Sequence, residues 1–443
     1  MNQLPADVER YLNKYSFKNW HVEIKLINPV DNAVIIPIIY EYENLRKLLD
    51  SLVQNDTKYF QRTAIIIVVN NFQDSSEVVK NDNQDSINFL HTIASECNTD
   101  DPLASQIINS NLSIGFIDAS SDGFEMPPKT GGVGLARKIG MDAALNIFDY
   151  RTAAKKILIG LDADCTVDPN YLTAIVDEFN KNNLSAAVVN FRHRIEDDSP
   201  NASAIICYEI FLHYYVLGLK YVNSPFAFHT IGSTMICDHA SYIKVEGMNK
   251  QKAAEDFYFL EKLAKNYIIE KINSTTVYPS VRSSWRVPFG TGQRVGRFLS
   301  KTQNEYLLYN PICFDILKAW LEVFNSEEIK TSTEYLNSAK KIHPELGNFL
   351  MEQNFNKDWD RILKNSTRAE QLAKQKQTWF DGFKTIKLIH YLRDKAYPQI
   401  DMFEALNGLF ERLDMKKDFF WYKESVPSLN IQKKYLQLLR ELT

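Results

Sequence analysis

The stretch Lys156-Ile-Leu-Ile-Gly-Leu-Asp162-Ala-Asp164-Cys165 decides how the rest of this chain is interpreted. Its apolar run has no helical periodicity, which is typical of a strand buried on both faces of a sheet. Two carboxylates follow it, one residue apart, where a parallel sheet ends and a ligand crevice begins. Because residues i and i+2 of an extended backbone point the same way, Asp162 and Asp164 could share a divalent cation. An aspartate-rich turn closed by Asp168-Pro169 explains the same pattern equally well.

Length and composition limit the classes of protein. The 443 residues allow a large core and two or three domains, and 45% hydrophobic with 24% charged residues is typical of a soluble globular protein. The net charge of -4 gives no global field that favours nucleic acid. Five scattered cysteines, never spaced as C-x-x-C, disfavour a disulfide framework and a zinc site. We therefore expect a cytoplasmic protein without a nucleic-acid partner.

The chain also argues against a membrane span. Residues 1–10 lack the apolar core of a signal peptide. The most apolar segment, residues 204–228, is interrupted by Glu209, His213 and Lys220. We expect a long aromatic-rich helix there and no transmembrane segment, which leaves peripheral contact with a membrane open.

The order of elements predicts an α/β fold. From residue 33 to residue 284, apolar runs alternate with segments of helical period, as in a sheet with crossover helices. Residues 33–37 and 64–69 are the first predicted strands, with a helix at 43–52 between them and a long excursion at 72–115. After residue 299 strand-like runs vanish and helical periodicity dominates. The predicted parts are a helical extension (1–30), an α/β domain (31–299) and an α-helical region (300–443).

A glycine-rich loop precedes a predicted helix at residues 129–145. Gly131, Gly132 and Gly134 let the backbone approach a ligand closely, and the helix start offers unpaired amides to an anion. The loop matches neither common nucleotide motif, because the P-loop lysine is missing and Arg137 stands where the dinucleotide loop has its third glycine. Taken alone, the glycines fit a tight turn at least as well as a binding site.

Two further charged groups stand out. Glu255-Asp256 begins an amphipathic helix, where the helix dipole favours carboxylates in any case; the functional interpretation is a general base. Four arginines interleaved with glycines and aromatics suit a diphosphate, although a solvated charged loop accounts for them too. They are Arg282, Arg286, Arg294 and Arg297.

In this order the motifs resemble the family 2 glycosyltransferases, GT-A-fold enzymes that use nucleotide-diphosphate sugars. The resemblance covers about residues 30 to 300 and is carried by an ordered set of motifs, none of which is decisive alone. These are residues 34–37, Glu41, 44–45, 65–69, 131–140, 161–164, 232–236 and 255–256. It implies a GT-A type Rossmann-like mixed sheet flanked by helices, followed by the appended α-helical region.

The resemblance also implies roles for individual residues. Asp162 and Asp164 would hold Mn²⁺ or Mg²⁺, and Asp256 would be the catalytic base with Glu255 as its neighbour. The nucleotide-sugar donor would be bound by Pro37, Ile39, Glu41, Asn70, Asn71, Gly131, Gly134, Arg137, Asp162, Arg294 and Arg297. The aromatic residues 208–221 and the segment 226–233 would flank the acceptor.

The chain departs from the family pattern at two places. Asn70-Asn71 stands where many members carry two aspartates after the second strand, so the donor stays open. Phe298 replaces the tryptophan of the processive motif, and no transmembrane helices follow it, which argues against polymer extrusion.

We expect metal-dependent transfer of a sugar from a nucleotide-diphosphate donor to a hydroxyl of a carbohydrate or lipid-linked acceptor, with inversion, in glycan or polysaccharide biosynthesis. Three alternatives remain: a retaining GT-A enzyme, a nucleotidyltransferase, and an inactive sugar-binding protein.

Overall fold

The computed structural model describes residues 4–443 except 27, 97–98, 196–200, 282–290 and 301. The chain forms two compact units. The N-terminal unit consists mainly of Met1–Arg194 and Thr230–Val281, and the C-terminal unit mainly of Ile195–His229 and Gly290–Thr443. The two are described separately.

A nine-stranded mixed sheet forms the N-terminal unit, in the order β1-β4-β3-β2-β5-β8-β7-β9-β6. The neighbours β4, β3, β2 and β5 run parallel, whereas β8 is antiparallel to both β5 and β7. This confirms the predicted α/β class with a mixed sheet. The strands are β1 (Glu23–Ile24), β2 (Asn32–Ile38), β3 (Thr63–Asn70), β4 (Ser113–Ala119), β5 (Ile157–Gly160), β6 (Cys165–Val167), β7 (Ala186–Phe191), β8 (Met235–Asp238) and β9 (Ile269–Pro279).

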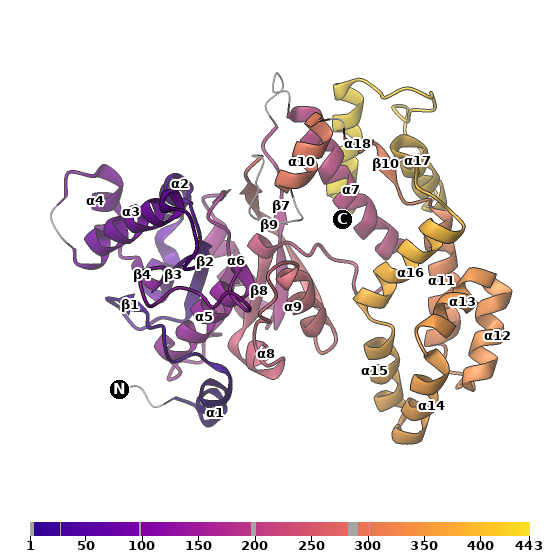
Figure 1. Ribbon diagram of the computed structural model, residues 1–443, viewed down its shortest axis with the longest axis horizontal. Helices are drawn as coiled ribbons and strands as arrows, with labels where there is room; N and C mark the ends of the chain where they lie inside the picture. The colour runs from indigo at the N-terminus through magenta and orange to yellow at the C-terminus, as the bar shows by residue number, and fades with distance from the viewer. Residues whose placement is uncertain (1–3, 27, 97–98, 196–200, 282–290, 301) are drawn as a thin grey trace. The chain divides into compact units, whose positions relative to one another are not determined.

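Helices cover both faces of this sheet (Figure 1). One face packs on α2, α3, α4 and α6, and its core includes Val34, Ile36, Ile65 and Ile67. The opposite face of β2 and β3 packs on α5, where a Cβ on Gly140 would lie 2.6 Å from Ile35. The helices of this unit are α1 (Ala6–Tyr15), α2 (Tyr42–Val53), α3 (Glu77–Ala94), α4 (Pro102–Ile108), α5 (Val133–Ile147), α6 (Tyr171–Lys181), α8 (His239–Lys244) and α9 (Glu255–Ala264), with 3-10 turns η1 (Thr57–Arg62) and η2 (Gly232–Thr234).

Helix α1 is part of the N-terminal unit. The hydroxyl of Tyr11 donates to Asp142 Oδ1 at 2.9 Å, and Tyr242 donates to the same oxygen at 2.8 Å. Lys138 Nζ pairs with Asp142 at 2.9 Å in this buried cluster. Buried charges need such partners, so the cluster fastens α1 to α5 and α8.

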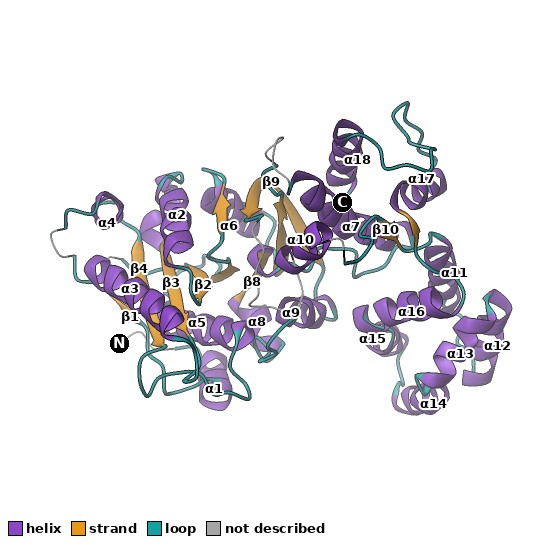
Figure 2. Ribbon diagram, turned by 45° about the horizontal axis from the view of Figure 1, so that its top comes forward, coloured by secondary structure: helices purple, strands orange, loops and turns teal. Residues whose placement is uncertain are grey.

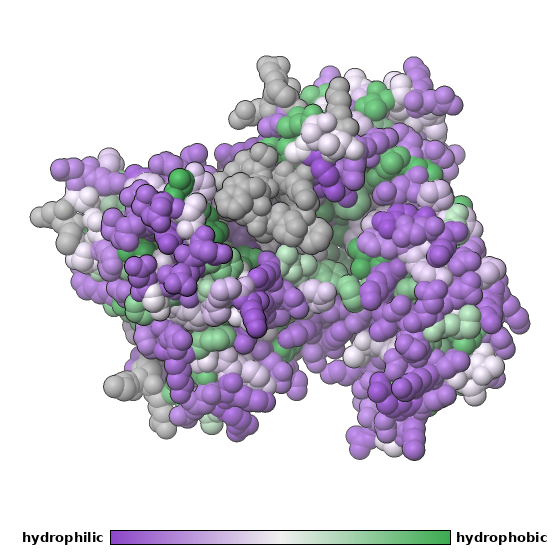
Figure 3. Space-filling model, viewed as in Figure 1, coloured by the Kyte–Doolittle hydropathy of each residue, from purple (hydrophilic) through white to green (hydrophobic). Residues whose placement is uncertain are grey.

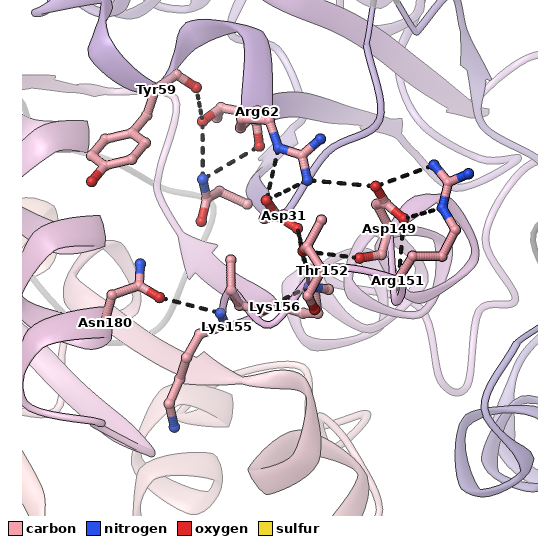
Figure 4. A network of polar contacts seen from close by, with 12 residues as sticks. Asp31, Tyr59, Arg62, Asp149, Arg151, Thr152, Lys155, Lys156 and Asn180 are labelled. Carbon is pink, nitrogen blue, oxygen red and sulfur yellow. Dashed lines mark hydrogen bonds and ion pairs between the residues drawn. The ribbon is translucent and has the colours of Figure 1, made fainter.

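A second buried network joins the amino ends of β2 and β5 (Figure 4). Asp31, which precedes β2, accepts a hydrogen bond from Arg62 Nε at 2.8 Å and from the Thr152 hydroxyl at 2.9 Å. Lys156, which precedes β5, places Nζ 3.0 Å from Asp31 Oδ1, the oxygen that also accepts from Thr152. Both Asp31 and Lys156 are buried, so neither charge has water as an alternative partner.

The C-terminal unit is helical, as the sequence predicts, and almost all strands lie in the other unit (Figure 2). The helical periodicity of the sequence predicts helices at 314–324, 333–341, 370–376, 381–395 and 429–442, and all five are present. Helices α10, α13, α14 and α17 were not predicted, so the loop expected around Arg294 and Arg297 is a helix there, and a two-strand ribbon corrects the expectation that strands vanish. The elements are α7 (Ala202–Tyr221), α10 (Thr291–Ser300), β10 (Leu307–Leu308), α11 (Ile312–Asn325), α12 (Ser332–Ile342), α13 (Pro344–Glu352), α14 (Phe355–Asn365), α15 (Ala369–Trp379), α16 (Gly382–Lys395), β11 (Ile400–Asp401), α17 (Met402–Arg412) and α18 (Leu429–Leu442).

Helix α7, expected within the α/β domain, packs with the C-terminal helices. A Cβ on Gly218 would overlap the ring of Phe314, so this glycine lets α11 approach α7. Arg440 of α18 donates to the buried Glu209 at 2.6 Å. In length and apolarity α7 alone, among the described helices, could cross a membrane, but 72% of its apolar window is buried inside the protein. Outer helices such as α12 and α14 present mainly hydrophilic side chains (Figure 3).

We expect Asp31→Ala to lower the free energy of unfolding of the N-terminal unit by about 3 kcal/mol, because it leaves the Lys156 ammonium buried without its carboxylate. The matched control is Asp177→Ala, which removes the exposed ion pair with Lys58 and should cost less than about 1 kcal/mol. Urea unfolding followed by circular dichroism measures both. Equal costs for the two variants would contradict the structural role given to Asp31.

Candidate functional site

The guanidinium of Arg137 lies at the centre of the candidate site. Helix α5 carries it beneath the end of β5, and the residue is only 2% exposed. Its Nη2 donates to Asp162 Oδ1, its Nε lies 3.3 Å from Glu255 Oε1, and its Nη1 donates to the Gly232 carbonyl at 3.1 Å. One cation thus joins residues from three distant parts of the sequence.

Burial alone would favour the neutral guanidine, but the charges of Asp162, Glu255 and Asp256 outweigh it and raise the pKa of Arg137. The residue is therefore a permanent positive charge. Its contacts in the structure are with protein groups, and its predicted contact with the donor stays a prediction.

Gly232 makes room for this arrangement. A Cβ on Gly232 would overlap Arg137 Nη2, so a larger residue at this position would displace the guanidinium. The amide of Gly232 also hydrogen-bonds to the Asp256 carboxylate. Because Gly160 lies opposite, with its Cβ position 3.0 Å from the Gly232 carbonyl, turn η2 comes close to the end of β5.

The acidic pair lies in the first turn of α9. Glu255 is buried, and desolvation raises its pKa although Arg137 opposes the rise. Asp256 is partly exposed, accepts a hydrogen bond from its neighbour Phe257's amide at 2.7 Å, and also has a pKa raised chiefly by desolvation. The residue before the pair, Ala254, has a φ of 58°, a left-handed conformation that is rare for alanine. Such a strained turn aims the pair, with Glu255 toward Arg137 and Asp256 toward Gly232.

Asp162 and Asp164 follow β5, as predicted from the opening stretch. The carbonyl of Asp162 accepts the amide of Cys165 at 3.2 Å, which closes a tight turn. The carbonyl of Asp164 accepts the amide of Ser280 at 2.9 Å, at the end of β9. Both side chains are partly exposed. The turn and the candidate metal site, which were alternatives at the sequence level, are therefore compatible: the backbone forms the turn and the carboxylates emerge from it.

The carboxylates of Asp162 and Asp164 provide only part of the ligand shell of an ion such as Mg²⁺ or Mn²⁺. No group of three or more His, Cys, Asp or Glu side chains among the described residues could hold a metal. Asp162 already binds Arg137 through one oxygen. Such ions take one or two carboxylates and complete their shell with phosphate oxygens and water, so the two aspartates suffice if a diphosphate is present.

The carboxyl ends of β2 and β3 are held together by asparagine side chains. Asn70 Nδ2 donates to the Ile38 carbonyl at 2.7 Å, and Asn83 of α3 donates to Asn71 Oδ1 at 2.8 Å. Asn71 Nδ2 donates in turn to the Ser120 carbonyl at 3.2 Å. Both predicted donor contacts, Asn70 and Asn71, are thus buried and shape the edge of the sheet; direct contact with a nucleoside stays a prediction.

The other predicted donor contacts on β2 lie at the same edge. Pro37 is buried at a position where β2 has passed the end of β5, so its missing N–H removes no hydrogen bond there. Glu41 begins α2 and accepts a hydrogen bond from Asn44 Nδ2 at 2.6 Å. Ile39 between them is partly exposed.

The glycines before α5 serve the packing of the protein itself. A Cβ on Gly134 would overlap the Gln251 carbonyl, and one on Gly131 would lie 2.6 Å from the ring of Phe72. Gly132, at the start of α5, has a φ of 137°. The close approach that Gly131 and Gly134 permit is therefore to other loops of this chain, and their predicted contact with the donor stays untested.

The predicted arginine cluster lies in the C-terminal unit as far as it is described. Arg294 pairs with Glu305, and Arg297 Nε lies 3.0 Å from the other oxygen of that carboxylate. Arg294 also lies over the ring of Phe211, 4.1 Å from its centroid. One buried glutamate thus compensates both arginines, and their role at a diphosphate stays a prediction. Arg282 and Arg286 lie outside the described residues.

Sequence reasoning missed two contributors to this site, Gly232 and Gly160, and one carboxylate at the end of the nearby strand β4. In the sequence, Gly232 belongs to a motif and Gly160 to a strand. Only the fold shows that Gly232 lies against Arg137 and that Gly160 lies against Gly232. Asp118, at the carboxyl end of β4, accepts hydrogen bonds from the Ser120 and Ser121 amides, and these outweigh desolvation and lower its pKa. The sequence did contain a signal for this carboxylate, because Asp118 follows an apolar run.

Comparison with known families matches a segment that carries part of this site. Residues 128–238 match the family model described as Glycosyl transferase family 2. The segment contains Arg137, Asp162, Asp164 and Gly232 and ends before Glu255. The resemblance inferred from the sequence is thereby confirmed. No curated protein matches the chain significantly.

Solved structures give only distant likenesses. S. aureus TarS 1-349 in complex with UDP-GlcNAc is 10% identical with a TM-score of 0.40, covering 82% of this chain and 92% of that one. The mannosyltransferase PcManGT from Pyrobaculum calidifontis, in complex with GDP-Man and Mn²⁺, is 15% identical with a TM-score of 0.37, covering 88% of this chain and 93% of that one. At these values neither likeness bears on substrate or metal.

We expect Gly232→Ala to disrupt the site, because its methyl group would occupy the position of Arg137 Nη2. The overpacking should destabilise the N-terminal unit by about 1–3 kcal/mol and weaken nucleotide-sugar binding. Gly296→Ala is the matched control, since a Cβ there meets nothing within 4 Å. Thermal unfolding and ligand titration measure both variants. Unchanged stability and binding in Gly232→Ala would contradict the packing described for Arg137.

Proposed function

From the premise that this chain carries a family 2 glycosyltransferase domain, we propose that it transfers a sugar, with inversion, from a nucleotide-diphosphate donor to an acceptor hydroxyl, with a divalent metal ion as cofactor. The acceptor is a carbohydrate or a lipid-linked sugar, and the reaction serves glycan or polysaccharide biosynthesis. The cytoplasmic location expected from the cysteines belongs to the same proposal; the four described cysteines are free and buried.

One observation carries the proposal: a single buried guanidinium connects Asp162, beside the sheet edge, to Glu255 in the acidic pair of α9. Transfer requires a group that stabilises the leaving diphosphate and a base that activates the acceptor, held at a fixed separation. Arg137 provides that connection between the two acidic pairs.

The two members of the α9 pair have different surroundings. Glu255 is buried against Arg137, whereas Asp256 is partly exposed and fixed by backbone amides. Only Asp256 can both receive a proton and reach a substrate, so we assign it as the base that deprotonates the acceptor hydroxyl. Glu255 positions Arg137.

Asp162 and Asp164 would hold the ion, with Asp164 as the firmer ligand because Arg137 occupies one oxygen of Asp162. When bound, the ion would neutralise charge that develops on the departing nucleoside diphosphate. The carboxylates of Asp162, Asp164, Glu255 and Asp256 exceed the single positive charge of Arg137, which gives the site the negative field that a cation requires.

We expect Asp256→Asn to lower kcat by about 10²- to 10⁴-fold while nucleotide-sugar binding persists, because the amide keeps the shape of the carboxylate and cannot accept the proton. Asp177→Asn on the exposed face of α6 is the control and should retain wild-type rates. Transfer kinetics with a panel of nucleotide sugars provide the measurement, and NMR of the product gives its anomeric configuration. If Asp256→Asn transferred sugar at the wild-type rate, the catalytic base would have to be another residue.

The pH dependence of the rate tests the same residue. Desolvation raises the pKa of Asp256 above its ordinary value of 3.8, and the base must be ionised to act. Activity should therefore rise with pH, and the acid limb of kcat/KM should lie above pH 3.8. The profile is measured from about pH 2.5 to about pH 9 in a mixed buffer. An acid limb at or below 3.8 would contradict this assignment.

We expect a chelator to abolish transfer and added Mn²⁺ or Mg²⁺ to restore it. Asp164→Ala should weaken the apparent affinity for the metal at least about tenfold, because it removes one of two protein ligands. Asp360→Ala, an exposed aspartate of α14, is the control. Wild-type rates of Asp164→Ala with and without chelator would exclude the metal assignment while leaving the glycosyltransferase activity itself open to measurement.

A further inference from the structure

The C-terminal unit contains a cavity of about 600 Å³ that no part of the proposed reaction uses. Helix α17 forms one wall, and strand β11, the start of α11 and the loop at 421–424 form the others. Its size suits a few sugar residues or a small organic ligand. The lining residues that matter here are Glu404, Glu411, Asn407, Trp421, Tyr422 and Glu424.

Carboxylates dominate the charge of this cavity. Glu404 and Glu411 lie on the same face of α17, and Glu424 belongs to the loop. All three are exposed, and none forms an ion pair within the described part of the chain. With Asp401 they make four carboxylates against two lining cations: Arg412, whose Nη2 donates to Asp315 at 2.7 Å, and Lys423, whose Nζ lies 4.9 Å from the centroid of the Trp421 ring. A phosphate or sulfate would therefore meet net repulsion, whereas hydroxyl groups would meet hydrogen-bond acceptors.

An aromatic pair lies at the rim. Tyr422 is 71% exposed, so the face of its ring is open to a ligand. The loop that carries it is not loose: the Trp421 amide donates to the Tyr435 hydroxyl at 2.6 Å and its carbonyl accepts from Asn407 at 2.7 Å. Tyr435 donates in turn to Asn407 Oδ1 at 2.6 Å, so a buried pair fixes the loop.

We infer that this cavity binds a neutral oligosaccharide. A fixed exposed ring offers a stacking face to the C–H surface of a pyranose, and the surrounding carboxylates accept hydrogen bonds from its hydroxyls. The binding of a neutral glycan does not depend on the proposed function.

Direct binding to the full-length protein tests the inference, with maltohexaose, cellohexaose and chitohexaose as neutral probes and hexagalacturonate as the anionic counterpart. We expect at least one neutral hexasaccharide to bind and hexagalacturonate to bind at least tenfold more weakly. Tyr422→Ala and Glu404→Gln should each weaken the neutral ligand tenfold or more. Phe383→Ala and Glu370→Gln, which alter an exposed ring and an exposed carboxylate elsewhere in this unit, should bind like the wild type.

Three outcomes would overturn the inference: no binding of any neutral probe, equal or tighter binding of hexagalacturonate, or unchanged affinity in Tyr422→Ala. Binding of nucleotide sugars to the wild-type protein is measured in parallel. Donor binding without glycan binding removes the inference and leaves the proposed function intact. Glycan binding without donor binding or transfer keeps the cavity as a glycan site and removes the proposed function.

Discussion

The buried guanidinium of Arg137 is the interaction on which the rest of the site depends. A charge that is 2% exposed must be compensated, and here Asp162 and Glu255 both do so. Removing either carboxylate would leave the cation with only one of these two partners in a dry environment. The two acidic pairs are therefore coupled energetically as well as geometrically, and the separation between the sheet edge and α9 is fixed by one side chain.

The positions without side chains matter as much as the charge. Gly232 leaves the space that the guanidinium fills, and Gly160 lets turn η2 approach the end of β5. Gly134 lets the loop at 249–252 pack against α5, close to the residues that precede Glu255. Each glycine loses more backbone entropy on folding than another residue would, but its missing Cβ permits the close approach. Together they bring β5, α5, η2 and α9 into contact around one group.

Much of the fold could be predicted because its signals are local. The apolar runs before Asn70 and before Asp162 are strands, and the helical periods of α2, α11, α16 and α18 are visible in the sequence. Helices α10, α13, α14 and α17 escaped prediction, although Phe355, Trp359 and Ile362 of α14 follow the helical period. Helix α7 was predicted as a helix, but its place in the C-terminal unit depends on packing against Phe314, which no local pattern encodes.

The sequence by itself determined the types of residue available for chemistry: two acidic pairs, a glycine-rich helix start and an arginine within it. Only the tertiary structure decided which contacts each of these residues makes. It buries Arg137 among carboxylates and pairs Arg294 and Arg297 with Glu305. It also engages Asn71 in hydrogen bonds that hold the carboxyl ends of the strands together. The physical reason is that burial and charge compensation depend on neighbours from distant parts of the chain, whereas strand and helix signals depend on neighbours in sequence.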